Sequence, residues 1–105
     1  MTQSVVIWGA GRIGRGFVAD LFTDAGYAIT FVDQAEALVT SLRERGQYTV
    51  VRTSGRERHD RVISGFEVLS TAQADQVAEA VAHADLMAVA VFPQDFPAVA
   101  QQLVH

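Results

Sequence analysis

The sequence predicts an α/β fold built on a doubly wound, mostly parallel β-sheet. Short apolar runs alternate along the chain with segments whose apolar residues recur at helical spacing. The first and last of these runs are apolar almost without interruption, as in strands that helices cover on both faces, and a glycine-rich turn follows the first run. The 105 residues suffice for one domain and no repeat or low-complexity linker divides them, so we treat residues 1–105 as a single unit.

Two strand–helix units are predicted in the first half of the chain. Ser4 to Trp8 is a nearly unbroken apolar run, which is typical of a central strand in a parallel sheet. Ala28 to Val32 predicts the second strand, and the apolar spacing from Ala35 to Leu42 predicts a second helix that ends at Gly46. Between the two strands, Gly26 ends a helix that we expect to pack on the sheet through Phe17, Val18, Leu21, Phe22 and Ala25.

An antiparallel hairpin is predicted next, inserted into the regular winding. Tyr48 to Val51 and Arg61 to Ile63 are short strand-like runs, and the polar stretch between them contains the turn signal Ser54-Gly55. Charges of both signs crowd this stretch, so we expect its arginines to keep a loop solvated, with binding of a phosphate substrate as the alternative. These arginines are Arg52, Arg56, Arg58 and Arg61.

Two further strands, each followed by a helix, complete the predicted fold. Phe66 to Leu69 is the third parallel strand, Val77 to Val81 marks a short helix, Leu86 to Phe92 is the fourth strand, and a last helix lies near Val99. In the usual winding these strands take the order 3-2-1-4, and the chain is truncated after strand 4 and its helix. The fourth strand then forms an uncharged edge, which predicts either a homodimer made by edge pairing or binding of another surface there.

The composition excludes several kinds of partner and chemistry. Twelve acidic residues against eight basic ones give a net charge of -4, which argues against binding nucleic acid or an anionic membrane. No apolar run reaches the roughly 18 residues of a membrane span, and the first residues lack the charged region of a signal peptide, so we expect a soluble cytoplasmic chain. Cysteine is absent and the three histidines are scattered, so no metal site is predicted.

A glycine-rich motif gives the strongest functional signal. Gly9-Ala10-Gly11-Arg12-Ile13-Gly14 has G-x-G-x-x-G spacing, follows a predicted strand and opens a predicted helix, as in the Rossmann dinucleotide-binding fold. In that fold Gly9 allows the tight turn, Gly11 the approach of a pyrophosphate and Gly14 the close packing of helix on strand. The pyrophosphate would bind the unpaired amides of the helix start. The alternative is a glycine-rich turn that holds no ligand.

Asp33 is the candidate ribose-binding residue. It closes the second predicted strand 22 residues after Gly11, where the dinucleotide fingerprint has an acid that accepts hydrogen bonds from the adenosine ribose. Gln34 and Ala35 supply no arginine for a 2′-phosphate, so the pattern favours NAD over NADP. The alternative is structural, because Asp33 and Glu36 also have the spacing of a capping box for the second helix.

Four other residues border the predicted site. Phe92 ends the fourth strand at the carboxyl edge of the sheet, so it is either a cofactor contact or a core aromatic residue. Arg12 lies in the phosphate loop and is equally consistent with a phosphate contact and with plain exposure. Arg15 is expected to be an exposed arginine in the first helical turn. Trp8 is expected to belong to the core or to the wall of a pocket.

The residues around this motif resemble the amino-terminal Rossmann domain of the mannitol dehydrogenase family, in particular its mannitol-1-phosphate 5-dehydrogenases. The resemblance covers most of the chain and rests on Val5 to Phe17, on Asp24-Ala25-Gly26 and on Thr30 to Asp33, with Gly14-Arg15-Gly16-Phe17 as its most specific part. It implies an NAD-dependent oxidoreductase that acts on a polyol phosphate. The site residues that it carries over are Gly9, Ala10, Gly11, Arg12, Ile13, Gly14 and Asp33.

The same resemblance limits what this chain can do by itself. Members of the family carry a catalytic lysine, with asparagine and histidine partners, in a helical carboxy-terminal domain, whereas this chain contains neither lysine nor asparagine. We therefore expect residues 1–105 to bind the cofactor, to lack catalytic residues and to meet a polyol phosphate or sugar phosphate only with that further domain. The alternatives are the Rossmann half of a hydroxy-acid dehydrogenase and a stand-alone regulatory module that senses NAD(H).

Overall fold

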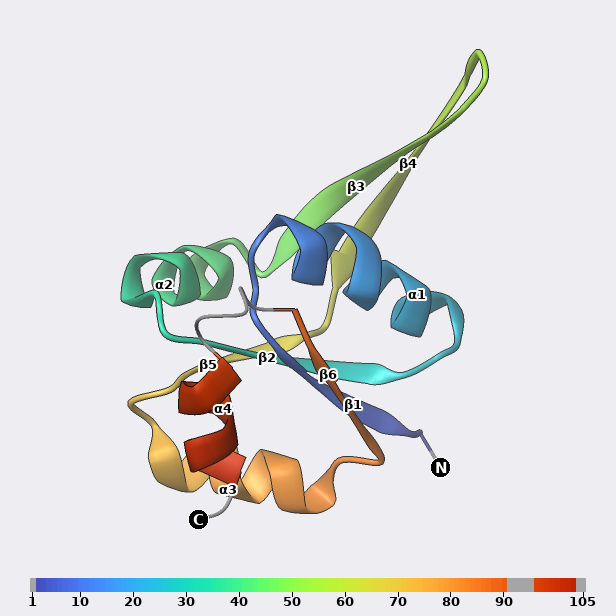
Figure 1. Ribbon diagram of the computed structural model, residues 1–105. Helices are drawn as coiled ribbons and strands as arrows, with labels where there is room; N and C mark the ends of the chain where they lie inside the picture. The colour runs from blue at the N-terminus through green and yellow to red at the C-terminus, as the bar shows by residue number, and fades with distance from the viewer. Residues whose placement is uncertain (1, 91–95, 104–105) are drawn as a thin grey trace.

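The fold is organised around one parallel sheet. The computed structural model describes residues 2–90 and 96–103, and it places four parallel strands in the order β5-β2-β1-β6 (Figure 1). The strands are β1 (Ser4–Trp8), β2 (Ala28–Asp33), β5 (Glu67–Ser70) and β6 (Leu86–Val89). In order of succession these are parallel strands 3-2-1-4, so the predicted order is confirmed.

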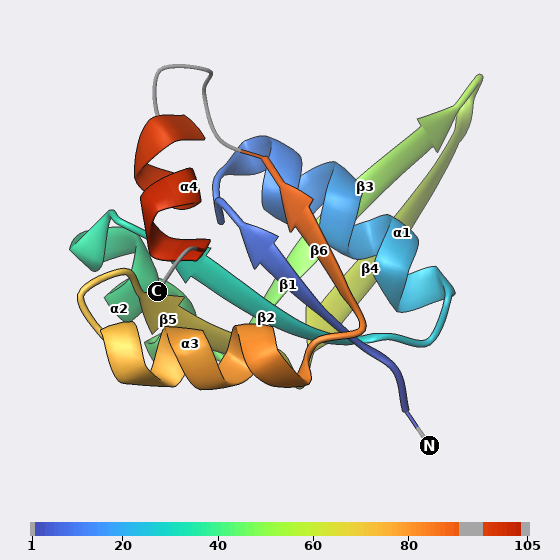
Figure 2. The ribbon, with the colours of Figure 1, turned by 60° about the horizontal axis from the view of Figure 1, so that its bottom comes forward.

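Helices cover both faces of this sheet. The π-helical segment η1 (Gly14–Val18) continues into α1 (Ala19–Asp24), and together with α2 (Glu36–Arg45) it covers one face. On the other face lie α3 (Ala74–His83) and α4 (Phe96–Leu103), and Figure 2 shows the sheet between the two layers. Within the described residues, no helix has the length and apolar character needed to cross a membrane.

The alternating side chains of β1 serve two separate cores. Val5 and Ile7 pack in the cluster under η1, α1 and α2, whereas Val6 and Trp8 pack in the cluster under α3 and α4. All four side chains are buried because β1 lies between β2 and β6 and has helices on both faces. This double burial explains why the strand reads as an unbroken apolar run.

The helix after the glycine loop differs from its prediction. Val18, Ala19 and Phe22 pack against the core, but Phe17 and Leu21 are 62% and 54% exposed. Ala25 is exposed as well. The prediction that Phe17, Leu21 and Ala25 face the sheet is therefore wrong, because only one side of the wide apolar stripe turns inward. Exposed Ile13 extends this outer apolar row at a spacing of four residues.

The inserted hairpin is longer than its apolar residues indicate. It consists of β3 (Gln47–Ser54) and β4 (Glu57–Ser64), paired from Gln47 opposite Ser64 to Ser54 opposite Glu57. The added residues are polar and pair through their backbones, so the apolar pattern did not reveal them. Figure 1 shows the hairpin projecting away from the rest of the molecule.

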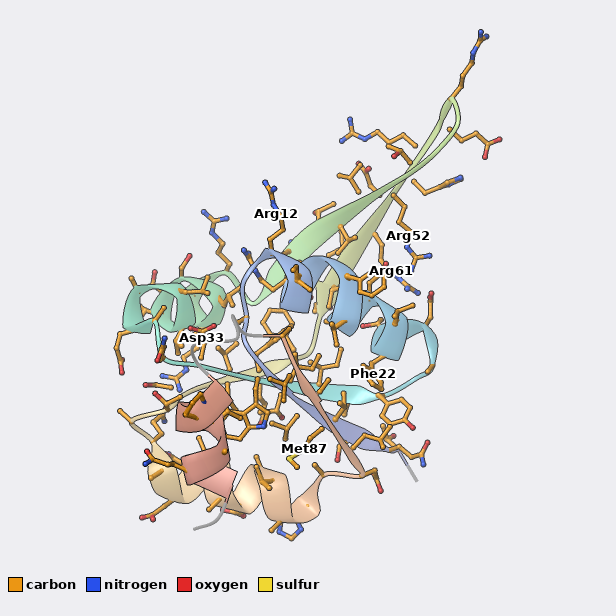
Figure 3. The ribbon with its side chains drawn as sticks, in the orientation of Figure 1. Arg12, Phe22, Asp33, Arg52, Arg61 and Met87 are labelled. Carbon is orange, nitrogen blue, oxygen red and sulfur yellow. The ribbon has the colours of Figure 1, made fainter. Side chains whose placement is uncertain are left out.

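Two hairpin arginines bind the helix beneath them. The Arg52 Nε–H donates to Asp20 Oδ2 at 2.6 Å, Arg61 donates to Asp20 Oδ1 at 3.1 Å, and both arginines also bind Asp24. Figure 3 shows Arg52 and Arg61 next to each other beside α1. The pKa of Asp20 is lowered because the hydrogen bonds from the arginines favour the charged carboxylate. The hydrogen bond from Arg52 has the largest effect. The expectation of a merely solvated loop is thus wrong for Arg52 and Arg61.

The fourth parallel strand lies at an edge of the sheet, as predicted. The structure gives β6 as Leu86–Val89, and Phe92, the expected end of this strand, lies outside the described residues. One side of β6 pairs with β1, and no further strand of the described sheet follows on the other side. Leu86, Met87 and Val89 are each 46% exposed, so an apolar edge faces solvent.

Candidate functional site

The glycine loop is fixed at the carboxyl edge of the sheet by its neighbours. The Gly9 N–H donates to the Val32 carbonyl at 2.8 Å, and the Trp8 carbonyl accepts the Ala90 N–H at 2.7 Å. Gly9 has a φ of 105°, a backbone conformation that residues other than glycine rarely adopt. The chain therefore turns at Gly9, directly after the end of the central strand β1, as the motif predicts.

The other glycines of the motif have different tasks. A Cβ on Gly14 would lie 2.0 Å from the Gly9 carbonyl oxygen, so only glycine lets the helix approach the loop this closely. A Cβ on Gly11 would meet no atom within 4 Å. Gly14 therefore serves the packing of helix on strand, while Gly11 leaves an open side of the loop where a ligand has room.

The helix start beyond the loop offers free binding capacity for an anion. The helix begins at Arg12, and the Arg15 N–H donates to the Gly11 carbonyl at 2.9 Å. Among the described residues no side-chain cap is found at this helix start, and its first turn carries no acid. The first amides of a helix lack intrahelical acceptors and the dipole there is positive. The helix then continues with a π-helical turn, in which the Ala19 N–H donates to the Gly14 carbonyl.

Arg12 and Ile13 are the exposed residues of the motif. Arg12 extends from the loop away from the sheet (Figure 3), and it has no ion pair within the described part of the chain. Ile13 is 64% exposed. The structure thus leaves both side chains at the open side of the loop.

Asp33 connects the end of β2 to the glycine loop. Its Oδ2 accepts the Ala10 N–H at 2.7 Å, and its Oδ1 accepts the Ala35 N–H at 2.8 Å. A carboxylate oxygen can accept more than one hydrogen bond, so both oxygens keep capacity for ribose hydroxyls. The structure therefore brings the predicted acid and the predicted phosphate loop into direct contact.

The predicted capping box is not formed. Helix α2 begins at Glu36 with Ala35 as its N-cap, and no side chain caps it. Asp33 bonds the backbone two residues on, before the helix starts, and the Glu36 carboxylate accepts the Ser70 hydroxyl at 2.5 Å. The correct spacing thus failed as a predictor because both acids have tertiary partners.

Two contacts near the site were not expected from the sequence. Arg15 is half-buried, with its guanidinium 5.9 Å from the ring centre of Tyr48, whose hydroxyl donates to the Arg15 carbonyl at 2.9 Å. Arg15 is therefore not the exposed arginine that its position predicts. Ser70, which is buried and faces Asp33 across the β2–β5 pair, holds Glu36. No local pattern indicates either contact, because both join elements far apart in the chain.

Two aromatic residues, Trp8 and Phe92, are predicted to lie near the site. Trp8 is 1% exposed and packs with Val6, Val32 and Val77, so it belongs to the core. Its indole N–H has no hydrogen-bond acceptor in the part of the chain that the structure describes. Phe92 lies outside the described residues, so its predicted contact stays a prediction.

The arrangement fits a dinucleotide. An open glycine, an uncapped helix start and a strand-end carboxylate with spare acceptor capacity lie together at the carboxyl edge of the sheet. This is the set of groups that a pyrophosphate and an adjoining ribose need. The position beside β1, where the strand order reverses, is also the usual ligand crevice of such sheets.

Comparison with known families agrees with this geometry. The model of the mannitol dehydrogenase Rossmann domain matches residues 3–105. The chain belongs to the mannitol dehydrogenase family. Its match to this family covers nearly the whole chain, including the glycine loop, β2 and the hairpin.

Individual members of the mannitol dehydrogenase family show the same relationship. The chain is 42% identical over 96 residues to a mannitol-1-phosphate 5-dehydrogenase of Geobacillus thermodenitrificans, which covers 90% of this chain and 25% of that protein. It is 44% identical over 96 residues to one of Brevibacillus brevis, covering 90% and 24%. With one of Shouchella clausii it shares 37% over 103 residues, covering 98% and 28%. The chain thus spans about a quarter of the length of these relatives.

Proposed function

We propose that this chain is the NAD(H)-binding domain of a cytoplasmic polyol-phosphate oxidoreductase, a mannitol-1-phosphate 5-dehydrogenase. The observation that carries the proposal is the 2.7 Å hydrogen bond from the Ala10 N–H to Asp33, because it joins the phosphate loop to the ribose acceptor in one rigid unit. The names of the relatives support the choice of substrate over a hydroxy acid and over a purely regulatory role.

Each site residue has a distinct part in holding the cofactor. The open side of Gly11 and the helix start at Arg12 and Ile13 receive the pyrophosphate. The Arg12 side chain adds a positive charge beside it, and Asp33 accepts the ribose hydroxyls. Gly9, Ala10 and Gly14 keep this loop in shape. Phe92 is kept as a contact at the end of the fourth strand. When bound, NAD supplies the hydride acceptor for oxidation of the polyol phosphate.

The chain alone lacks the lysine that the family uses for proton transfer at the reacting carbon. It contains no lysine and no asparagine, so the catalytic lysine of the family must come from a further domain, which would also contact the substrate. Purified residues 1–105 are therefore expected to bind NADH but not to oxidise mannitol 1-phosphate. Turnover by this chain, measured as NADH formation, would contradict the two-domain proposal.

Calorimetric titration with NADH and NADPH tests the cofactor preference. We expect tighter binding of NADH, because the Asp33 carboxylate pairs with a ribose diol but repels a 2′-phosphate. Asp33→Asn removes a charged acceptor worth about 1.5 to 3 kcal/mol, so NADH binding should weaken about 10-fold to 100-fold. Thermal unfolding of the same variant reports how much of the loss is structural. Equal or tighter binding of NADPH to the natural chain would overturn the preference.

Gly11→Ala separates binding from folding. The free loop has room for the added methyl group, so we expect the melting temperature to change little, while the methyl group occupies the approach of the pyrophosphate and NADH binding is lost. Gly16→Ala is the matched control, because its Cβ also meets nothing within 4 Å but lies beyond the loop. Unchanged NADH affinity in Gly11→Ala would show that the cofactor does not bind this loop.

A further inference from the structure

The end of β5 brings a second carboxylate to the ribose side of the site. Ser70 is the register partner of Asp33 in the parallel β2–β5 pair, and the Thr71 N–H donates to the Asp33 carbonyl at 3.1 Å. The Ser70 hydroxyl donates to Glu36 Oε1 at 2.5 Å. Glu36 is thus drawn toward the strand end where Asp33 stands, three residues before it in the chain.

This position of Glu36 is fixed rather than incidental. Ser70 is 3% exposed, and its Oγ also accepts the Ala72 N–H at 3.1 Å, so its hydroxyl hydrogen is directed to Glu36. The Ser70 N–H is in turn bonded to the Gln73 side chain, which also binds Arg43. A surface glutamate at a helix start would otherwise sample many side-chain conformations.

The geometry points to Glu36 as a second determinant of cofactor specificity. Its carboxylate would disfavour binding of a 2′-phosphorylated dinucleotide. The inference rests on the proposed NAD(H) site. Asp33 accepts from the loop amide and from Ala35, so it is anchored at the ribose, while Glu36 adds negative charge at the adjoining start of α2. A 2′-phosphate would meet two carboxylates there, whereas a 2′-hydroxyl carries no charge to be repelled.

Glu36→Gln tests this inference in the full chain, with calorimetric titration of NADH and NADPH. Removal of one like charge should tighten NADPH binding about threefold to tenfold, and NADH binding should stay within about twofold. The gain should shrink at high salt, because the repulsion is electrostatic. Ser70→Ala frees the Glu36 side chain and should shift the NADH-to-NADPH ratio in the same direction by a smaller factor.

Glu44→Gln is the control, because it makes the same change of charge on an exposed residue of α2 about 12 Å further along the helix. It should leave both affinities unchanged. If the natural chain prefers NADH but Glu36→Gln does not alter the ratio, or if Glu44→Gln alters it equally, the role of Glu36 is refuted and the proposed NAD(H) site stands. Failure of the natural chain to bind either dinucleotide overturns both.

Discussion

Single residues divide the glycine motif into positions that pack tightly and positions that face open space. Gly14 faces the Gly9 carbonyl, Gly11 faces open space, and the Ala10 amide is taken by Asp33. Spacing alone marks all of these positions equally. The contacts show that substitutions at neighbouring glycines of one motif should have unlike effects, one on folding and another on binding.

Gly14→Ala is expected to destabilise the fold. The new Cβ would stand 2.0 Å from a backbone oxygen, which cannot move without displacing the loop, so we expect a loss of about 2 to 4 kcal/mol in the free energy of unfolding. Urea unfolding measures it. Gly16→Ala should be neutral or stabilising by up to about 1 kcal/mol, because it adds a helix former in open space. Equal stability of the two variants would contradict the close packing of loop and helix.

Among the elements, the hairpin depends most on charge. Most residues of β3 and β4 are exposed, and a lone two-stranded hairpin is only marginally stable in water. Tyr48, Val50 and Ile63 attach its base to the body, and Asp20 holds Arg52 and Arg61 further out. The docked direction of the hairpin is therefore set by an ion-pair cluster on α1.

Asp20→Asn should loosen the hairpin. The Asp20 side chain is only 9% exposed, but its partners are 45% and 34% exposed, so solvent screens the cluster and we expect a loss of about 1 to 2 kcal/mol at neutral pH. Urea unfolding measures the loss in the free energy of unfolding, and hydrogen exchange of the β3 and β4 amides shows whether the loss lies in the hairpin. Asp60→Asn, which removes an exposed partner of Arg58, is the control and should have no effect.

The contribution of Asp20 should depend on pH in the acid range. Because its pKa is lower in the folded than in the unfolded chain, the stabilisation is complete above the ordinary value of 3.8 and is lost as the pH falls through the folded-state pKa. The natural chain and Asp20→Asn should therefore converge in stability at low pH. A constant difference down to about pH 2 would show that the loss comes from packing and not from charge.

At the scale of the whole molecule, the open edge of β6 predicts a homodimer. Leu86 to Val89 carries no charge, so two chains of net charge -4 can meet there with little repulsion. Antiparallel pairing across a two-fold axis at Ala88 would set Met87 opposite Val89 of the second copy and satisfy the free backbone groups. The exposed row Ile13, Phe17 and Leu21 on the neighbouring helix adds apolar surface on one face.

Sedimentation equilibrium at micromolar and higher concentrations measures this association. The natural chain should reach a dimer, and Met87→Lys should remain monomeric, because each dimer would carry two unpaired charges in the edge pair. Val62→Lys changes a valine on the hairpin that is 57% exposed, and it should leave the dimer intact. A natural chain that stays monomeric at the highest concentration would refute edge pairing.

Local sequence patterns determined the strand succession, the parallel order and the place of the candidate site. The double burial of β1, the helical spacings and the glycine motif each act over a few residues, and apolar periodicity records burial directly. For the same reason Gly11, Gly14 and Asp33 could be named as candidate site residues from their spacing. Each of these features depends on interactions within a short segment, so the residues of that segment are enough to predict it.

Only the tertiary structure decided which partners the polar residues take. Arg52 and Arg61 reach Asp20, Arg15 lies against Tyr48, and Ser70 holds Glu36, each across more than 30 positions of the chain. A charged side chain can satisfy its hydrogen bonds with solvent or with many neighbours, so its local sequence does not specify one. The apolar periodicity of the chain therefore determined the scaffold. The packing of elements onto one another determined the contacts that hold the hairpin and those that position Glu36 near Asp33 in the candidate site.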